Sequence, residues 1–304
     1  MKRNILSIIM SVKDDNLYLD QSILSILKQS YNKFRFIIVD DGAGRKVKKK
    51  ILFYKKMDKR IEIIRNNKNL GLTISLIKAI KYAKSKFIAR IDSDDYCDPE
   101  RIEKQMSWIQ KSKKRVLCGT NYFLVKNNKL VKKEINFGYH KIKKDLIFKN
   151  CFVHSSTLFR LKAYKKVGGY NPYFKYSQDY DLWSRLINCG IADNLRERLT
   201  YIRDHKKTVS KLKRGDQTIN SIIISCNNYH YLKKKKFFKI SKDSSKNLKY
   251  IQSLRFFDNF YKSLLFLNRK KLKYKFDIKF YNLNWECLKI CIKQPKMFVY
   301  NLLG

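Results

Sequence analysis

FIARIDSDDYCDPERI, residues 87–102, decides the fold class, because it joins an apolar run to a helix start through a loop of acids. The run Phe87–Ile91 is apolar and of a length typical of a strand. A helix is expected to follow, with Asp98 as its cap, Pro99 at its first position and an apolar stripe that begins at Ile102. The stretch therefore predicts a strand-loop-helix unit.

Three carboxylates crowd the loop of this unit: Asp92, Asp94 and Asp95. Their mutual repulsion is costly unless a cation is present. Hard oxygen ligands on a loop suit Mg²⁺ or Mn²⁺, which bind through one or two carboxylates plus the phosphates of a substrate. The loop is therefore a candidate metal site, and a solvated acidic turn with a helix cap is the alternative interpretation.

The preceding residues alternate between strand-like and helix-like segments. Three further apolar runs read as strands: Ile5–Met10, Phe34–Val39 and Ile61–Ile64. Segments of helical period separate them, so βαβ units and a mostly parallel sheet are expected in an α/β fold. In such a sheet ligands bind beyond the carboxyl ends of the strands, and in this sequence polar residues follow each run.

A second acid pair, Asp40 and Asp41, follows the run that ends at Val39. A carboxylate there can accept hydrogen bonds from a base or from ribose hydroxyls, whereas a purely structural turn before a helix is the alternative. The neighbouring Gly42 and Gly44 lack the third glycine of a dinucleotide fingerprint. Hydride transfer therefore loses its main support.

Composition sets further bounds on the chain. Its 304 residues suffice for one large α/β domain plus an appendage, and its seven cysteines show no CxxC pair, so reduced cysteines in a cytosolic protein are expected. We expect neither a signal peptide nor a membrane span. The formal net charge of +44 is spread along the whole chain, which favours a compositional bias over a specific nucleic-acid site. Attraction to an anionic lipid surface is the remaining functional interpretation.

Three blocks of the sequence, taken in order, resemble family 2 glycosyltransferases of the GT-A fold. They are SIIMSVKDDNLYLDQSILSILKQSYNKFRFIIVDDGA (7–43), NLGLTISLIKAIKYAKSKFIARIDSDDYCDPERIEKQ (69–105) and HSSTLFRLKAYKKVGGYNPYFKYSQDYDLWSRL (154–186). The resemblance implies a mostly parallel central sheet flanked by helices over residues 1–215. A donor half would span about 1–112 and an acceptor half about 113–215, with a helical, basic and aromatic extension at 216–304.

The resemblance also implies roles for the donor-side residues. Asp41 would hold the base, and Asp94 would bind the Mn²⁺ or Mg²⁺ that bridges the donor's phosphates, with Asp95 supporting the loop. The other residues placed around the nucleotide sugar are Ser11, Lys13, Asp40, Asn69, Asp92 and Ser93. The family usually has Pro-x-Tyr where this chain has Ser11-Val12-Lys13, and Ser or Asn where it has Ala43, so base specificity is left open.

In the acceptor half, Asp179 resembles the family's catalytic base, although an acid at a helix start is also common for capping and dipole reasons. The family usually has Glu where Gln178 stands. His205, after the strand-like Leu199–Arg203, would complete the metal site or touch the diphosphate, and a solvent-facing loop histidine is the alternative. His154, in a predicted strand His154–Arg160, reads as a core histidine.

Beyond residue 216 cations and aromatic residues are interleaved, which suits a membrane interface, while a helical cap is the alternative. The resemblance implies an inverting enzyme in the cytoplasm, peripheral on the inner face of the membrane. It would move a sugar from a nucleotide diphosphate sugar, a UDP-sugar by preference, to a hydroxyl of a glycan or lipid-linked acceptor in cell-surface polysaccharide or lipopolysaccharide synthesis. The competing hypothesis is a non-catalytic sugar- or nucleic-acid-binding protein with a GT-A-like fold.

Overall fold

A computed structural model describes residues 5–14, 17–127 and 129–205, together with a few positions between 216 and 231. The chain divides into two compact units, Met1–Leu212 and Lys213–Gly304. The central sheet and the helices that flank it belong to the first unit. Most of the predicted extension at 216–304 lies outside the described residues. Within the described residues, no helix combines the length and the apolar character that a membrane crossing requires.

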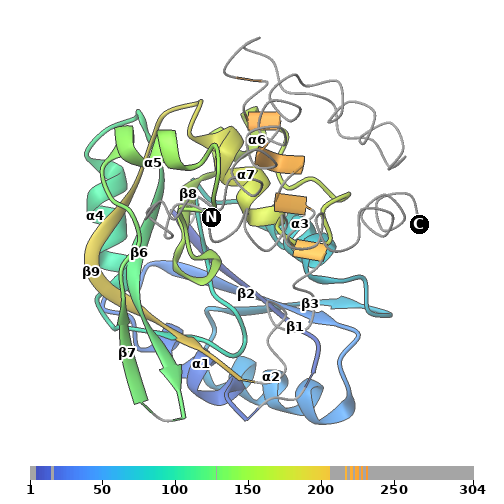
Figure 1. The fold of residues 1–304 in the computed structure, drawn as a ribbon. Coiled ribbons are helices and arrows are strands. Elements are labelled where there is room, and N and C mark those ends of the chain that lie inside the picture. The colour runs from blue at the N-terminus through green and yellow to red at the C-terminus, as the bar shows by residue number, and fades with distance from the viewer. Residues whose placement is uncertain are drawn as a thin grey trace. The chain divides into compact units, whose positions relative to one another are not determined.

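The four apolar runs of the donor half form the parallel part of one sheet (Figure 1). Their order is β3-β2-β1-β4, and each neighbouring pair is parallel. The strands are β1 (Leu6–Val12), β2 (Phe34–Asp41), β3 (Ile61–Asn66) and β4 (Phe87–Arg90). Because β1 lies between β2 and β4, the residues that end these three strands come together at one edge of the sheet.

The sheet continues beyond β4 in the order β8-β6-β9-β5. These strands are β5 (Tyr96–Cys97), β6 (Arg115–Lys126), β8 (Leu158–Arg160) and β9 (Ile191–Arg203), and β7 (Lys129–Lys133) pairs with β6. The pair β6 and β9 is parallel, whereas β8, β5 and β7 run antiparallel to their neighbours. Six of the sheet's nine described strands therefore run in one direction, and the expected α/β architecture is confirmed.

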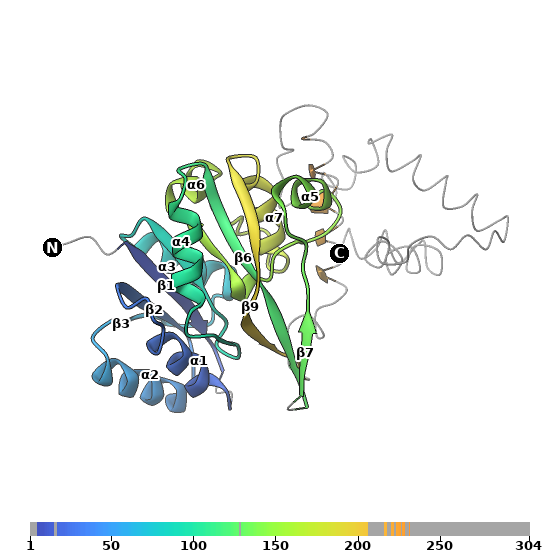
Figure 2. The same cartoon turned by 90° about the vertical axis from the view of Figure 1, so that its left-hand side faces the viewer.

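Helices cover both faces of this sheet (Figure 2). Alternate residues of β1, such as Ile8 and Met10, share a buried core with apolar side chains of α1, α2 and α4, while α3 contacts β1 and β2 and buries its own apolar stripe. The alternation follows from the two-residue period of a strand. The helices are α1 (Leu19–Leu27), α2 (Arg45–Met57), α3 (Leu72–Tyr82), α4 (Arg101–Gln110), α5 (Tyr139–Asp145), α6 (Leu161–Lys166) and α7 (Gln178–Leu186).

Two local predictions need correction. The predicted strand His154–Arg160 begins as a 3₁₀ turn, η1 (His154–Ser156), because the hydroxyls of Ser156 and Thr157 donate to backbone carbonyls three residues earlier, at 2.8 and 2.9 Å. The helix expected from Pro99 begins at Arg101. Asp98 instead caps the turn before the helix, where its carboxylate accepts the backbone N–H of Glu100 at 2.9 Å.

Candidate active site

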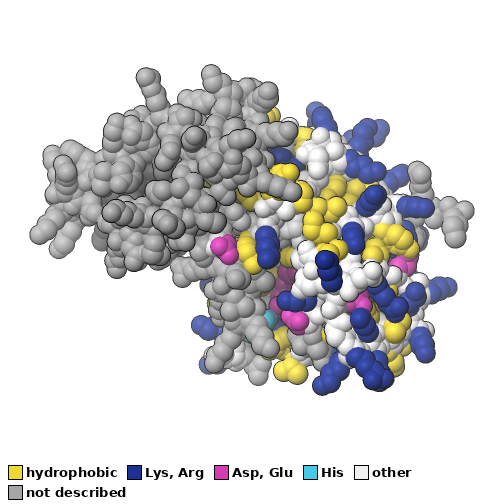
Figure 3. Space-filling view, turned by 90° about the vertical axis from the view of Figure 1, so that its right-hand side faces the viewer, with side chains coloured by type: hydrophobic (Ala, Val, Ile, Leu, Met, Phe, Trp, Pro, Cys, Tyr) yellow, Lys and Arg dark blue, Asp and Glu magenta, His cyan; other side chains and the backbone are white. Residues whose placement is uncertain are grey.

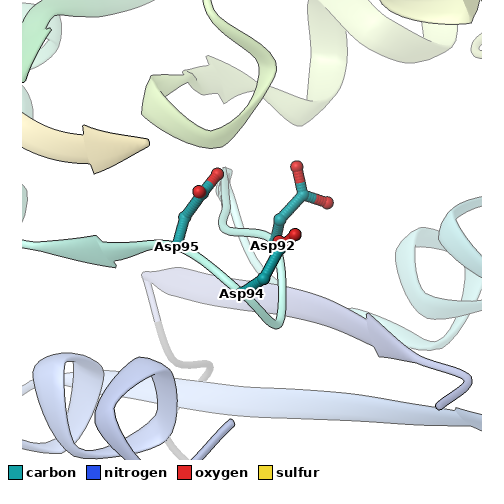
Figure 4. Close-up of side chains that lie close together, drawn as sticks. All are labelled: Asp92, Asp94 and Asp95. Carbon is teal, nitrogen blue, oxygen red and sulfur yellow. The ribbon is translucent and has the colours of Figure 1, made fainter. Parts of the chain in front are cut away.

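The three acids that follow β4 gather on one loop (Figure 4). One carboxylate oxygen from each of Asp92, Asp94 and Asp95 lies within 4.8 Å of the others. Asp92 and Asp94 are partly exposed, whereas Asp95 is buried. Ser93, between them, is partly exposed as well. The loop therefore presents two carboxylates toward solvent, with a third beneath them.

Asp92 is held by a cation that comes from its own strand. The guanidinium of Arg90, only 1% exposed, forms an ion pair with one oxygen of Asp92. The Ser155 hydroxyl lies 3.0 Å from the other oxygen, and the backbone N–H of Asp92 donates to that hydroxyl at 3.0 Å. An arginine in the middle of an apolar strand is thus explained by the acid two residues later.

Asp95 is held from two sides. The Ser155 hydroxyl lies 2.5 Å from one of its oxygens, and the backbone N–H of Arg203 donates to the other at 2.9 Å. Burial and the nearby charge of Asp94 raise the pKa of Asp95 to about 7. Because Ser155 has one hydroxyl hydrogen, it serves Asp92 or Asp95 at any moment, and the shorter distance favours Asp95.

Asp94 meets a residue 111 positions away in the chain. Its carboxylate lies 2.9 Å from Nε2 of His205, and its backbone carbonyl accepts a hydrogen bond from the guanidinium of Arg203. That guanidinium lies over the rings of Tyr18, at 4.2 Å, and Tyr96, at 4.7 Å. Arg203 therefore ties the acid loop to the start of α1 and to the end of β9.

These residues fit a divalent cation. The carboxylate oxygens are the ligands that Mn²⁺ and Mg²⁺ prefer in proteins, and one imidazole nitrogen lies beside them. The crowding that raises the pKa of Asp95 is the repulsion that a bound cation relieves. The candidate ligands are Asp94 and His205, with Asp92 beside them.

The acid pair Asp40 and Asp41 forms the last two residues of β2, so the strand extends two residues beyond the apolar run that predicted it. Asp41 is 2% exposed, and its carboxylate accepts hydrogen bonds from the Asn66 amide at 2.9 Å and from the backbone N–H groups of Leu70 and Gly71 at 2.8 and 2.9 Å. It thus holds the turn that contains Asn69. Its predicted role in binding the base stays a prediction.

Asp40 and Gly42 complete this corner of the site. One oxygen of Asp40 accepts the backbone N–H of Ala43 at 2.8 Å, and the other is buried with no partner among the described residues. Gly42 has φ +71°, and a Cβ added there would lie 2.5 Å from the backbone nitrogen of Asn69. Only glycine fits this close approach, so the acid pair and the Asn69 turn form one rigid unit.

Ser11 and Lys13 lie beside these acids at the end of β1. Ser11 pairs with Val39 in the register of β1 and β2, and it is partly exposed. Lys13 is exposed and lies 3.8 Å from the carboxylate of Asp14. The sheet order thus brings Ser11, the Asp40 pair and the loop of Asp92 to one edge, although their contacts with a nucleotide stay predictions.

Asp179 belongs to the first turn of α7, and its carboxylate accepts a hydrogen bond from the Asn150 amide at 2.8 Å. Burial raises the pKa of Asp179, while the backbone N–H of Tyr180, the amide of Asn150 and the charge of Arg90 oppose the rise. The same arginine also interacts with Asp94 and Asp95. Asp179 therefore shares its electrostatic surroundings with the acid loop.

Asp181 has a separate place, as its spacing from Asp179 predicts. It is buried and pairs with Arg185 at 2.5 Å, one turn further along α7. His154, the predicted core histidine, lies with Nε2 2.7 Å from the Tyr170 hydroxyl, and burial holds the pKa of its imidazole well below the usual value. A neutral histidine in an aromatic cluster suits that interpretation.

Sequence reasoning missed four residues that organise this site: Arg90, Asn150, Ser155 and Arg203. Arg90 carried a signal, because a charge inside an apolar strand must find a partner. The other three carried none, since an isolated Asn, Ser or Arg in a loop or strand end is ordinary. Their acidic partners lie 29 to 109 positions away in the chain, and local sequence patterns do not reveal contacts over such separations.

A parallel sheet of this order, with its polar groups beyond the carboxyl ends of the strands, is the arrangement of nucleotide-binding α/β proteins. The chain belongs to glycosyl transferase family 2, whose pattern it matches over residues 7–168. The chain is therefore a glycosyltransferase, as the sequence predicts.

Individual relatives agree with this membership. The chain is 37% identical over 214 residues to the O-antigen biosynthesis glycosyltransferase WbnJ of Escherichia coli, a match that covers 68% of this chain and 83% of WbnJ. It is 30% identical over 197 residues to the E. coli UDP-Glc:alpha-D-GlcNAc-diphosphoundecaprenol beta-1,3-glucosyltransferase WfgD, covering 61% and 74%. It is 29% identical over 205 residues to the amylovoran biosynthesis glycosyltransferase AmsE of Erwinia amylovora, covering 67% and 76%.

Among solved structures, the fold is similar to that of S. aureus TarS 1-349 in complex with UDP-GlcNAc, with a TM-score of 0.60 and 14% identity. The match covers 74% of this chain and 66% of that one, which is just under two thirds of its length. Identity this low supports the fold alone. The expected GT-A fold is confirmed.

Proposed function

We propose that this glycosyltransferase moves a sugar from a UDP-sugar to a hydroxyl of a glycan or lipid-linked acceptor, with inversion at the anomeric carbon, in the synthesis of a cell-surface polysaccharide or lipopolysaccharide. The observation that carries the proposal is that Asp94, whose carboxylate lies 2.9 Å from Nε2 of His205, and Asp179 both interact with the buried charge of Arg90. The name of WbnJ supports a role in O-antigen synthesis, and the name of WfgD supports UDP as the nucleotide.

Asp179 acts as the general base in the proposed reaction. Its carboxylate takes the proton of the acceptor hydroxyl as the oxygen attacks the anomeric carbon, and the bond between that carbon and the diphosphate oxygen breaks on the opposite face. A positioned base of this kind contributes about 10²- to 10⁴-fold. The raised pKa of Asp179 increases its affinity for that proton, and the amide of Asn150 orients it.

On the donor side, Asp94 and His205 would hold a Mn²⁺ or Mg²⁺ ion, with Asp92 beside them contacting the ribose. When bound, such an ion stabilises the negative charge that develops on the leaving diphosphate. Ser11, Lys13, Asp40, Asp41, Asn69 and Ser93 would surround the nucleotide sugar. Arg90 fixes the carboxylate of Asp92, Ser155 fixes that of Asp95, and Arg203 fixes the backbone of Asp94.

The proposal includes a cytoplasmic location with peripheral attachment to an anionic inner membrane surface, where a lipid-linked acceptor would lie. The name of WfgD, a transferase acting on a diphosphoundecaprenol-linked sugar, supports an acceptor of this kind. Flotation with anionic vesicles tests the attachment. Comparison of the full chain with a chain that lacks the tail, residues 220–304, tests whether the tail contributes to membrane binding. Unchanged binding after truncation would end the role of the tail.

Release of nucleoside diphosphate from a panel of nucleotide sugars, with Mn²⁺ and with EDTA, tests the reaction. We expect Mn²⁺-dependent release from one UDP-sugar, faster when an acceptor is added and absent in Asp94→Asn. If no sugar in the panel loses its nucleotide with any acceptor, the alternative of a non-catalytic sugar-binding protein is favoured instead.

A further inference from the structure

The helix α2 carries an unusual combination of side chains on its outer face. Arg45–Met57 contains six lysines, one arginine and no acid. Its inner face buries Val47, Ile51 and Tyr54 against the core. Apart from Lys50, which is partly buried, these cations are exposed and lie on the remaining surface of the helix, which turns away from the sheet.

Exposed apolar side chains lie among these cations. Leu52 is 37% exposed, Phe53 58% and Met57 62%, so this one helix carries three of the ten large apolar residues that are exposed in the described part of the chain. Phe53 and Met57 are four residues apart and therefore adjacent on the helix surface, with Lys49 one turn before Phe53. Cations alone do not distinguish α2, because Lys and Arg are scattered over other described surfaces (Figure 3). The apolar residues among them do.

The helix is also firmly attached to the domain. The hydroxyl of Tyr54 donates to the carboxylate of Asp20 at 3.0 Å, and Lys50 forms an ion pair with the same acid at 2.9 Å. Both contacts join the inner side of α2 to α1. A rigid helix whose outer face combines cations with apolar side chains is preorganised for a flat partner.

The strand β7 offers the nearest comparison. Leu130 and Val131 are exposed there among Lys129, Lys132 and Lys133. Successive side chains of a strand point to opposite faces, so Leu130 and Val131 do not share a surface. On α2 the helical period places Phe53 and Met57 together. Of the two basic elements, α2 alone presents its apolar residues and its cations on one face.

We propose that the outer face of α2 docks on an anionic lipid surface, with Phe53 and Met57 entering the headgroup region and Lys46, Lys49 and Lys56 lying at the lipid phosphates. A basic amphipathic helix that lies in the plane of the interface binds in this way. A nucleic acid would use the cations and leave Leu52 and Met57 without a role. The inference rests on the proposed attachment to a membrane and names the surface responsible for it.

Flotation of the full chain with phosphatidylcholine vesicles, with and without phosphatidylglycerol, tests this surface. A charge variant combines Lys46→Gln, Lys49→Gln and Lys56→Gln, and an apolar variant combines Phe53→Ser and Met57→Ser. The matched controls on β7 are Lys129→Gln, Lys132→Gln and Lys133→Gln, and separately Leu130→Ser with Val131→Ser. We expect the charge variant to lose about tenfold or more in partitioning to anionic vesicles, because each lysine contributes near the surface.

The apolar variant should lose most of the binding that survives added salt, whereas both controls should stay close to the parent chain. Phe53→Trp gives a second readout, since its fluorescence should be quenched by brominated lipids. Far-UV circular dichroism and nucleotide release check that each variant is folded, because none of these residues belongs to the active site.

Each remaining outcome overturns the inference. If the parent chain does not float with anionic vesicles, both the membrane attachment and the role of α2 fall. If the parent floats and the α2 variants float equally well, or if the β7 controls lose as much, only the role of α2 falls. If the charge variant loses binding to duplex DNA while its vesicle binding is unchanged, the surface is a nucleic-acid site instead.

Discussion

The carboxylates of the acid loop and the carboxylate of Asp179 differ in how the protein holds them. Asp92 has a guanidinium partner, Asp94 an imidazole and Asp95 two hydrogen-bond donors. Among the described residues, the hydrogen-bond partners of Asp179 are neutral, namely the Asn150 amide and backbone N–H groups, and burial raises its pKa. The partners of the acid loop hold its carboxylates in fixed positions, as a metal and diphosphate site requires. Asp179 retains affinity for a proton, as a base requires.

The substitution Asp94→Asn tests the acid loop. We expect kcat/KM to fall about 1,000-fold, because a cation held by this carboxylate stabilises the leaving diphosphate by several kcal/mol. Steady-state kinetics over a Mn²⁺ titration should show that saturation needs much more metal. Full activity of the variant at the parent's metal concentration would remove Asp94 from the metal site.

The substitution Asp179→Asn tests the proposed general base. We expect kcat to fall about 100- to 1,000-fold while the KM for the donor and the dependence on Mn²⁺ stay near the parent values, since only the proton acceptor is lost. Stopped assays at saturating donor measure this. Loss of donor binding equal to the loss of kcat would instead make Asp179 part of the donor site.

Stability provides a control for the same variant. The folded-state pKa of Asp179 is raised, so the folded protein favours the protonated acid, and that stabilisation is present at low pH and lost as pH rises through the folded pKa. At neutral pH the ionised group therefore disfavours folding. We expect Asp179→Asn to melt at a temperature equal to or above that of the parent chain, so that its inactivity is not the result of unfolding.

Arg90 interacts with both the acid loop and Asp179, so its replacement should affect both parts of the site. Arg90→Met removes the ion pair of Asp92 and the cation that opposes the raised pKa of Asp179. We expect a loss of about 2 kcal/mol in the free energy of unfolding, because Asp92 loses its partner, and a smaller loss in Arg90→Lys. Urea unfolding measures it. Equal stability of the two variants and the parent would show that this ion pair contributes nothing.

The kinetic effect of Arg90→Met should touch both sides together. The KM for the donor should rise, because Asp92 loses the partner that fixes it. The acidic limb of the pH profile should move to higher pH, because the cation that favours the ionised form of Asp179 is lost. A change in only one of these measurements would mean that Arg90 serves one side and that the two are independent.

The fold was predictable where its signals are local. Apolar runs give β1 to β4 to within a few residues, because β1, β2 and β4 are buried on both faces and β3 is partly buried. Only the last five residues of β9 read as a strand, because its first part, Ile191–Arg198, mixes exposed charges with buried apolar residues. The two residues of β5 are too few for any periodicity. Hydroxyl groups that bond to nearby carbonyls turned the start of the predicted strand at His154 into η1.

The site was predictable in part for the same reason. Asp92, Asp94 and Asp95 are neighbours in sequence, so their gathering on one loop follows from the chain alone. The meeting of Asp94 with His205 came only through the family resemblance, because 111 residues separate them. No pattern pointed to Ser155 or Asn150, whose roles depend on side-chain geometry that forms only when β8, α7 and the loop before η1 pack together.

Of the variants considered, Asn150→Ala should have the smallest effect, because it changes only the proton affinity of Asp179. The amide of Asn150 stabilises the ionised carboxylate, so its removal should raise the pKa of Asp179 further. The base must be ionised to accept a proton, so the acidic limb of kcat/KM should move to higher pH, by less than about one unit for a single hydrogen bond. Activity well above the limb and the Mn²⁺ dependence should both match the parent chain. A limb that moves to lower pH would contradict the assignment of Asp179 as the base, since loss of a donor to a carboxylate cannot favour its ionised form.

Asn136→Ala is the matched control, because it removes an amide that donates to Asp145 and leaves the partners of Asp179 unchanged.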